Sequence, residues 1–176
     1  MASNEIPFVL VVNASSDMCT ALEKQTKLAF GSASQPSLYC RPDSEQHPRM
    51  RPVDRPQFSL IFVDCQPWIA ERAALPVLKD WTPPRWLLDD VARQVPYALC
   101  VLLVPSQTLN AVNARRPALA GQLRQQLCVL SRELVTEDGF HLEVLDAWAK
   151  ADAIKHRTRE RFERLRFGKR RGGSNG

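Results

Sequence analysis

The chain has 176 residues, 44% of which are hydrophobic, and a formal net charge of +5. That length suits one domain that buries about two-thirds of its surface without disulfides or metals. Because no apolar run approaches the roughly 20 residues that span a bilayer, and residues 1–5 lack the basic region of a signal peptide, we expect no contact with a membrane.

The first predicted element is a strand at residues 8–12, which leads through a polar turn into a helix at residues 18–30. Ser15 or Ser16 suits the N-cap of that helix, and Gly31 suits its end. Strand, tight turn and helix is the arrangement in which nucleotide-binding α/β domains present a phosphate loop.

The turn lacks the residues that bind phosphate. Aligned with the Walker pattern G-x-x-x-x-G-K-[ST], it places Asn13, Met18 and Cys19 where the motif needs two glycines and a lysine, and only Thr20 fits. Asp17 adds a negative charge where phosphate would lie, and these changes should cost on the order of several kcal/mol of nucleotide binding. The sequence therefore predicts a nucleotide-binding shape that holds no nucleotide, or equally an ordinary first strand of an α/β fold.

The middle of the chain contains further buried strands. Apolar runs predict strands at residues 58–64 and 98–104, and a shorter strand at residues 37–40. Residues 41–57 have almost no apolar content and are predicted to form a mobile loop. A helix is expected at residues 82–95, where Thr-Pro-Pro precedes apolar residues at helical spacing.

The C-terminal third shows the clearest helical pattern, from Pro117 to Leu134, with leucines at intervals of three or four residues. A last strand is predicted at residues 140–145, followed by a helix that Asp146 caps and that extends to about Phe167. Its apolar face consists of Trp148, Ala151, Ile154, Thr158, Phe162 and Leu165. Strands alternating with helices predict a mostly parallel, doubly wound sheet with helices on both faces, a Rossmann-like three-layer α/β fold.

The positive charge is concentrated at the C-terminal end. Nine basic and two acidic residues lie between positions 155 and 171, leaving 15 basic and 17 acidic residues elsewhere. The basic residues are Lys155, Arg157, Arg159, Arg161, Arg164, Arg166, Lys169, Arg170 and Arg171. We expect this segment to bind nucleic acid without sequence preference, an acidic protein surface, or an import receptor. Residues 1–167 are expected to form the single domain, and residues 168–176 a disordered basic tail.

No pattern indicates a catalytic centre, a metal or a cofactor. The five cysteines form no C-x-x-C pair, and the three histidines lack metal-ligand spacing, so we expect a reducing compartment, nucleus or cytoplasm. Asp64 ends a predicted strand, where a receiver domain carries its phosphorylated aspartate, but the acidic pair and the lysine of receivers are not found at the predicted strand ends. Capping of the next turn explains Asp64 as well, and a degenerate receiver-like signalling domain remains an alternative.

Several segments, in chain order, carry a resemblance to a known family. They are FVLVVNASSDMCT in place of a phosphate loop, FSLIFVD as an inner strand, ALCVLLVPSQ where base recognition would occur, the leucine-striped helix predicted from Pro117 to Leu134, and GFHLEVLD before a long terminal helix. By this order the chain resembles small-GTPase-like proteins that have lost nucleotide binding. The resemblance implies a non-catalytic pseudo-GTPase scaffold that stabilises partner subunits of the inner kinetochore, in the nucleus.

Two functional hypotheses follow. The first is a nucleotide-free scaffold subunit of a nuclear assembly, with Trp68, Trp81 and Trp86 as candidate partner contacts. Filling of the core explains any one of these tryptophans as well. The second is a nucleic-acid-binding module that acts through the arginine-rich terminal helix and tail. The two are compatible if the scaffold lies on chromatin.

Overall fold

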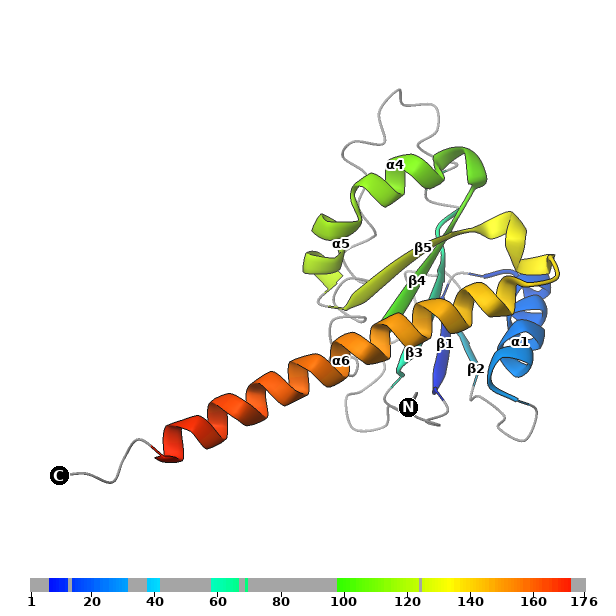
Figure 1. Cartoon of the computed structure of the whole chain (residues 1–176). Coiled ribbons are helices and arrows are strands. Elements are labelled where there is room, and N and C mark those ends of the chain that lie inside the picture. Colours follow the sequence, from blue (N-terminus) through cyan, green and yellow to red (C-terminus); the bar gives the residue numbers. More distant parts are fainter. Residues whose placement is uncertain are drawn as a thin grey trace.

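The computed structural model describes residues 7–12, 14–31, 38–41, 58–66, 69, 98–123 and 125–171. Within them, five parallel strands form one sheet in the order β2-β1-β3-β4-β5 (Figure 1). The strands are β1 (Val9–Val12), β2 (Leu38–Arg41), β3 (Leu60–Asp64), β4 (Leu99–Val104) and β5 (Gln126–Ser131). This order is one of the two common orders of doubly wound α/β domains. The predicted fold class is therefore confirmed.

Helices cover both faces of the sheet and complete three layers (Figure 1). They are α1 (Ser16–Phe30), α4 (Leu109–Ala114), α5 (Arg116–Leu123) and α6 (Phe140–Arg171), with short 3-10 helices η3 (Ser106–Thr108) and η4 (Arg132–Thr136) after β4 and β5. Residues of α1 and α6 pack on one face of the sheet, and residues of α4 and α5 pack on the other.

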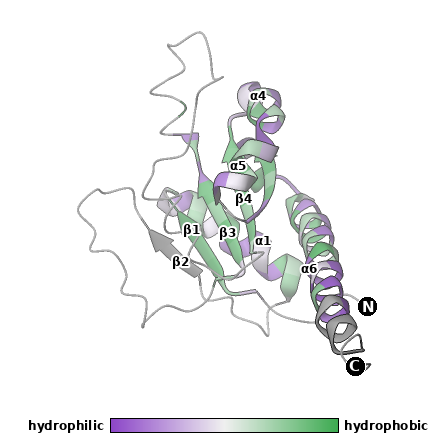
Figure 2. Cartoon of the chain, turned by 90° about the vertical axis from the view of Figure 1, so that its left-hand side faces the viewer, coloured by the Kyte–Doolittle hydropathy of each residue, from purple (hydrophilic) through white to green (hydrophobic). Residues whose placement is uncertain are grey.

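The central strands are buried on both faces, which explains why they read as continuous apolar runs. Every residue of β1, β3 and β4 is buried, and Figure 2 shows these strands as mostly hydrophobic. Alternate side chains enter different cores: Leu10 and Ile61 pack toward α4 and α5, whereas Val11 and Phe62 pack toward α1 and α6. Because each buried side chain of this size contributes about 1.5–3 kcal/mol, the sheet is the main source of stability.

The start of the chain folds as predicted. The turn after β1 leads into α1, where Ser15 Oγ accepts a hydrogen bond from Met18 N at 3.3 Å. The helix ends at Gly31, whose φ of 90° favours glycine and whose N–H donates to the carbonyl oxygen of Lys27. The next three predicted strands form β2, β3 and β4, with ends shifted by at most two residues.

The predicted helix from Pro117 to Leu134 is wrong beyond α5, because residues 126–131 form β5 and η4 follows it. The leucine spacing was misleading. Leu127 and Leu130 lie on opposite faces of β5, where they pack against different cores. A strand that contacts apolar residues on both faces carries an apolar run, and a run of this kind can also fit a helical spacing.

The predicted strand at residues 140–145 is also wrong, because this segment begins α6. A strand would place Phe140, Leu142 and Val144 on one face. In the helix, Phe140 and Val144 are buried, whereas Leu142 is 60% exposed. Asp146 therefore lies inside the helix and does not cap it.

One helix of 32 residues, α6, covers the sheet with its first half and projects beyond it with its second (Figure 1). It continues to Arg171, past the predicted end at Phe167, so the first four residues of the predicted disordered tail are helical. Several predictions concern segments outside the described residues: the loop at residues 42–57, the helix at residues 82–95, the tail at residues 172–176, and Trp68, Trp81 and Trp86.

Candidate functional site

The carboxyl edge of the sheet is the first place to look for a ligand. All five strands are parallel, so the turns that follow them meet at this edge. In doubly wound sheets, ligands bind there at the point where the strand order reverses, which in this chain lies between β1 and β3.

In the described part of the turn after β1 and the start of α1, two hydroxyl side chains bond to the backbone of the same segment. Ser15 Oγ caps α1 through the N–H of Met18, and the Thr20 hydroxyl donates to the carbonyl oxygen of Ser16 at 3.0 Å. Asp17 is exposed in the first turn of the helix. Its carboxylate complements the helix dipole, as a phosphate would in a nucleotide-binding protein. Thr20, the single residue that fits the Walker pattern, thus donates to the backbone of its own helix.

The turn after β3 is held by an ion pair between a buried carboxylate and a partly exposed arginine. Asp64 is 2% exposed, and Nε of Arg132 donates to its two carboxylate oxygens at 3.1 and 3.0 Å. One of these oxygens also accepts a hydrogen bond from Gln66 N at 3.1 Å, so Asp64 caps the turn as the sequence suggested. Since Arg132 follows β5, the ion pair spans β4 and ties two non-adjacent strands together.

The turns after β4 and β5 share a second carboxylate. Glu133 Oε2 accepts hydrogen bonds from Ser106 N at 3.0 Å, Ser106 Oγ at 2.9 Å and Ser131 Oγ at 2.7 Å. Slight burial raises the pKa of Glu133. The hydrogen bonds from Ser131 and Ser106 lower this pKa by a larger amount, so its net shift is downward. Glu133 therefore stays ionised and occupies the donors that a bound anion would need.

The described part of the carboxyl edge carries three carboxylates, on Asp17, Asp64 and Glu133, and the basic residue Arg132, which pairs with Asp64. Arg41 ends β2 at the same edge, and its side chain lies outside the described residues. Binding a phosphate there would require breaking an ion pair at a site 2% exposed and adding an anion beside carboxylates. Asp64 and Glu133 thus already accept hydrogen bonds from donors of the same chain.

Sequence reasoning missed Arg132 because it placed the last strand at residues 140–145. The lysine that a receiver carries after a later strand is still not found after β4 or β5, but Arg132 places a cation beside Asp64. A signal was present: the apolar run Leu127–Leu130 is followed directly by Ser-Arg-Glu, a polar turn like those after the other strands. The acidic pair that receivers carry after the first strand is still not matched by Ala14, Ser15 or Ser16.

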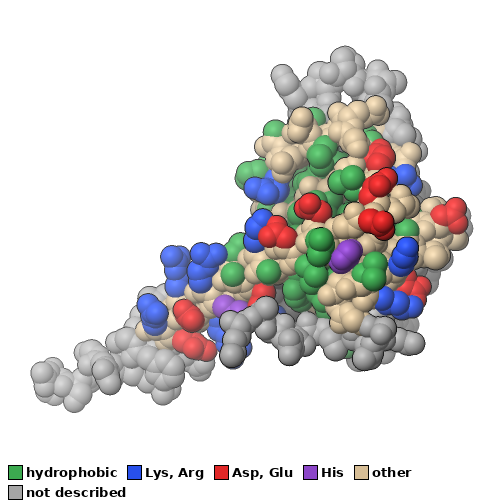
Figure 3. Space-filling model, turned by 45° about the vertical axis from the view of Figure 1, so that its right-hand side comes forward, with side chains coloured by type: hydrophobic (Ala, Val, Ile, Leu, Met, Phe, Trp, Pro, Cys, Tyr) green, Lys and Arg blue, Asp and Glu red, His purple; other side chains and the backbone are tan. Residues whose placement is uncertain are grey.

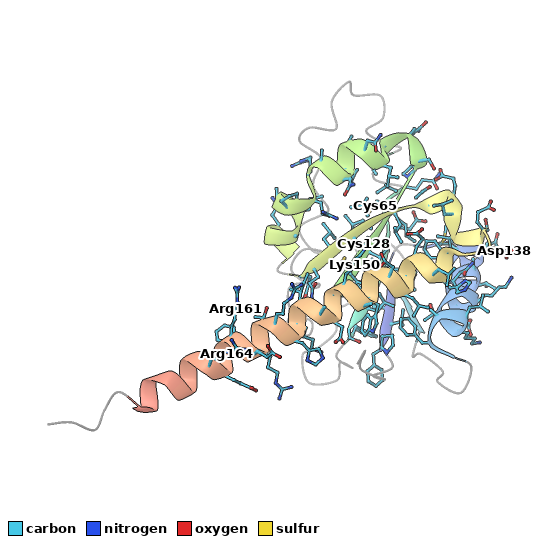
Figure 4. The ribbon with its side chains drawn as sticks, viewed as in Figure 1. Cys65, Cys128, Asp138, Lys150, Arg161 and Arg164 are labelled. Atoms are coloured by element: carbon cyan, nitrogen blue, oxygen red, sulfur yellow. The ribbon has the colours of Figure 1, made fainter. Side chains whose placement is uncertain are left out.

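A groove of about 480 Å³ lies between β5 and α6 and is lined by apolar residues and by Arg116, Glu143, Asp146 and Lys150. Cys128 faces it (Figure 4), and burial raises the pKa of this thiol. Asp146, which hydrogen-bonds Lys150, raises the pKa of that amine. A protonated thiol and a paired lysine are poor nucleophiles, so the groove gives no basis for covalent catalysis.

The arginines predicted to bind a partner extend along the projecting half of α6. Arg157, Arg159, Arg161 and Arg164 are exposed, and Figure 4 shows Arg161 and Arg164 on the part of the helix that extends beyond the sheet. Arg159 pairs with Glu163 at 3.3 Å. Lys155 is partly buried. The helix also carries Arg166, Lys169, Arg170 and Arg171, whose side chains lie outside the described residues.

The structure thus places the predicted basic residues on one helix but far from the carboxyl edge. Among the described residues, no group of three or more His, Cys, Asp or Glu side chains has the geometry of a metal site. None of the described helices combines the length and the hydrophobicity that crossing a bilayer requires.

Comparison of the chain with protein-family models, with curated proteins and with solved structures gives no match.

Proposed function

We propose that this protein is a non-catalytic, nucleotide-free scaffold subunit of a nuclear protein assembly. The segments FVLVVNASSDMCT, FSLIFVD and ALCVLLVPSQ resemble the pseudo-GTPase family, and within that family centromere protein M, a resemblance that implies a place in the inner kinetochore. The proposal needs no cofactor and no reaction. Its partners are other protein subunits, and the cytoplasm is the alternative location.

The observation that carries the proposal is the ion pair between Asp64 and Arg132. It occupies the carboxyl edge, where a doubly wound domain would bind its ligand. Removing the cation from a buried carboxylate leaves an uncompensated charge, which is costly. The Asp64–Arg132 pair therefore supports a carboxyl edge that is held in place by contacts within the chain. The hydrogen bonds that Glu133 accepts likewise connect the turns after β4 and β5 to each other.

Equilibrium dialysis of the full chain against labelled GTP and ATP, with magnesium, tests the proposal. We expect no saturable binding at micromolar nucleotide. A useful second chain is Asp17→Lys, which restores a cation to the turn after β1 and removes an anion. Micromolar binding by the native chain would refute a nucleotide-free scaffold, whereas weak binding gained only by D17K would support the electrostatic explanation.

A second candidate function, nucleic-acid binding, is favoured by the exposed arginines of α6. Phosphate attraction of this kind is salt-dependent and independent of sequence. We expect truncation after Ile154 to abolish any retention of the chain on a DNA duplex. Unchanged retention after truncation would exclude α6 as the binding element.

The receiver-like alternative is favoured by Arg132 beside Asp64, but the same pair makes Asp64 inaccessible. Incubation of the full chain with labelled acetyl phosphate distinguishes the two readings. We expect no incorporation of phosphate, and labelling that Asp64→Asn abolishes would establish a phosphoacceptor in place of a scaffold.

A further inference from the structure

The apolar face that attaches α6 to the sheet continues past the end of the sheet. Val144, Ala147 and Ala151 lie three or four residues apart and are buried against the strands. The same spacing continues through Ile154, Thr158 and Phe162, and residues three or four apart share one face of a helix. We call Ile154, Thr158 and Phe162 the distal stripe.

The distal stripe is not covered by the described residues. Ile154 is 43% exposed and Phe162 is 63% exposed, although both continue the face on which Ala151 is buried. A large exposed apolar side chain in line with a buried face, on a part of the helix that no other described element covers, indicates a surface that is buried by a partner. Leu142, equally exposed, lies on the opposite side of α6 from the buried face and has no such continuation.

Cations lie on both sides of the distal stripe. By helical spacing, Arg157, Arg161 and Arg164 form a row along one side, and Lys155 and Arg159 lie on the other. Within the described residues, Arg161 and Arg164 make no hydrogen bond or ion pair with another side chain. The acidic side chains of this part of the helix, Asp152, Glu160 and Glu163, occupy the remaining face. Figure 3 shows both basic and acidic side chains on this part of α6.

We propose that the distal half of α6 docks into an apolar groove of a partner protein whose rims carry carboxylates. An amphipathic helix that lays an apolar face into such a groove is a common recognition mode. Acidic rims would complement the row of arginines on one side of the distal stripe and Lys155 and Arg159 on the other. The inference rests on the proposed scaffold function and names the chemistry of its partner.

Two other occupants fit the stripe less well. Nucleic acid would use the arginines but gains little from Ile154 and Phe162, since its outer surface is phosphate. A flat bilayer would have to approach from the side that the sheet occupies, because the stripe continues the face of α6 that packs on the sheet. A groove in a protein can instead curve around the helix beside the domain.

The test measures binding of the full chain to a synthetic acidic helical peptide, with leucines at heptad a and d positions and glutamates at e and g. A peptide of the same composition in scrambled order is the control. We expect the patterned peptide to bind at least about tenfold more tightly than the scrambled one. Equal binding of both peptides, or no binding of the patterned peptide, would overturn the proposal.

Substitutions on the two faces of α6 sharpen the test. We expect Phe162→Ser to weaken peptide binding about tenfold or more, and Leu142→Ser, at a similarly exposed position on the other side, to leave it unchanged. Both variants should retain the circular dichroism of the native chain. A Phe162→Ser chain that binds as tightly as the native chain would contradict the proposal.

Parallel measurements use a DNA duplex of about 30 base pairs and vesicles containing phosphatidylserine. Binding to either that exceeds peptide binding, and that falls with Phe162→Ser, would assign the stripe to that partner instead and overturn our proposal. The outcome is independent of nucleotide dialysis: micromolar GTP binding would refute the scaffold function and leave the peptide result standing, whereas failure of the peptide would leave the scaffold function intact.

Discussion

Charged residues behave in opposite ways at the carboxyl edge of the sheet and on the distal half of α6. At the edge, Asp64 and Glu133 are matched by donors from the same chain. On the distal half of α6, Arg161 and Arg164 have no such match among the described residues. The comparison shows that position in a known binding fold is a weaker guide to function than whether the polar groups there are already satisfied.

The largest expected effect contrasts the buried and exposed parts of one helix face. Val144→Asp should destabilise the protein by about 3–5 kcal/mol or prevent folding, because it buries an unpaired carboxylate at a position 1% exposed. Phe162→Asp, on the same face of α6, should change stability by less than about 0.5 kcal/mol. Urea denaturation followed by circular dichroism measures both. Equal losses would show that the distal half is packed against the domain.

The next effect compares two arginines. Arg132→Leu should cost about 2–4 kcal/mol, since it leaves the buried Asp64 carboxylate without its cation. Arg161→Leu should be close to neutral because its side chain is exposed. Adding Asp64→Asn to Arg132→Leu should recover part of the loss in a double-mutant cycle of urea denaturation. A neutral Arg132→Leu would show that the carboxyl edge does not depend on this ion pair.

A smaller effect concerns the cap of α1. Ser15→Ala should cost about 1 kcal/mol, because it removes the hydrogen bond from Met18 N. Ser16→Ala is the matched control, as its side chain is exposed at the first helical position. Thermal unfolding of both variants gives the comparison, and an equal loss in both would argue against Ser15 as the cap.

The smallest effect is a dependence on pH. The pKa of Glu133 is lowered in the folded chain below its ordinary value of 4.5. The stability that this adds is present above that value and is lost as the pH falls through the folded pKa. Glu133→Gln should therefore flatten the fall in stability below about pH 4.5, by at most a few tenths of a kcal/mol, because solvent screens this exposed carboxylate. An unchanged acid titration of stability would contradict it.

Much of the fold was predictable because several elements carry explicit signals. β1, β3 and β4 are short apolar runs that end in polar turns, and α1 has a serine at its start and a glycine at its end. The type and the bounds of β5 and α6 were not predictable from spacing alone. Leu127 and Leu130 fit a helical interval, yet they lie on a strand and pack against two different cores. In a short apolar run, periodicity cannot distinguish a buried strand from a helix.

The features of the candidate sites likewise fall into two groups, those that the sequence predicted and those that it did not. The basic residues and the apolar face of the last helix were visible in sequence, because both depend on local spacing. The pairing of Asp64 with Arg132 was not visible, because it depends on which strand lies beside which. The hydrogen bonds from Ser106 to Glu133, 27 residues away, have the same origin.

The continuity of α6 has a mechanical consequence. At 1.5 Å per residue, its 32 residues form a rod of about 48 Å without a break. The near end of that rod is anchored by apolar packing at Phe140 and Val144, so it cannot swivel freely against the domain. A protein that binds the far end of α6 would therefore fix the orientation of the whole domain as well as its position.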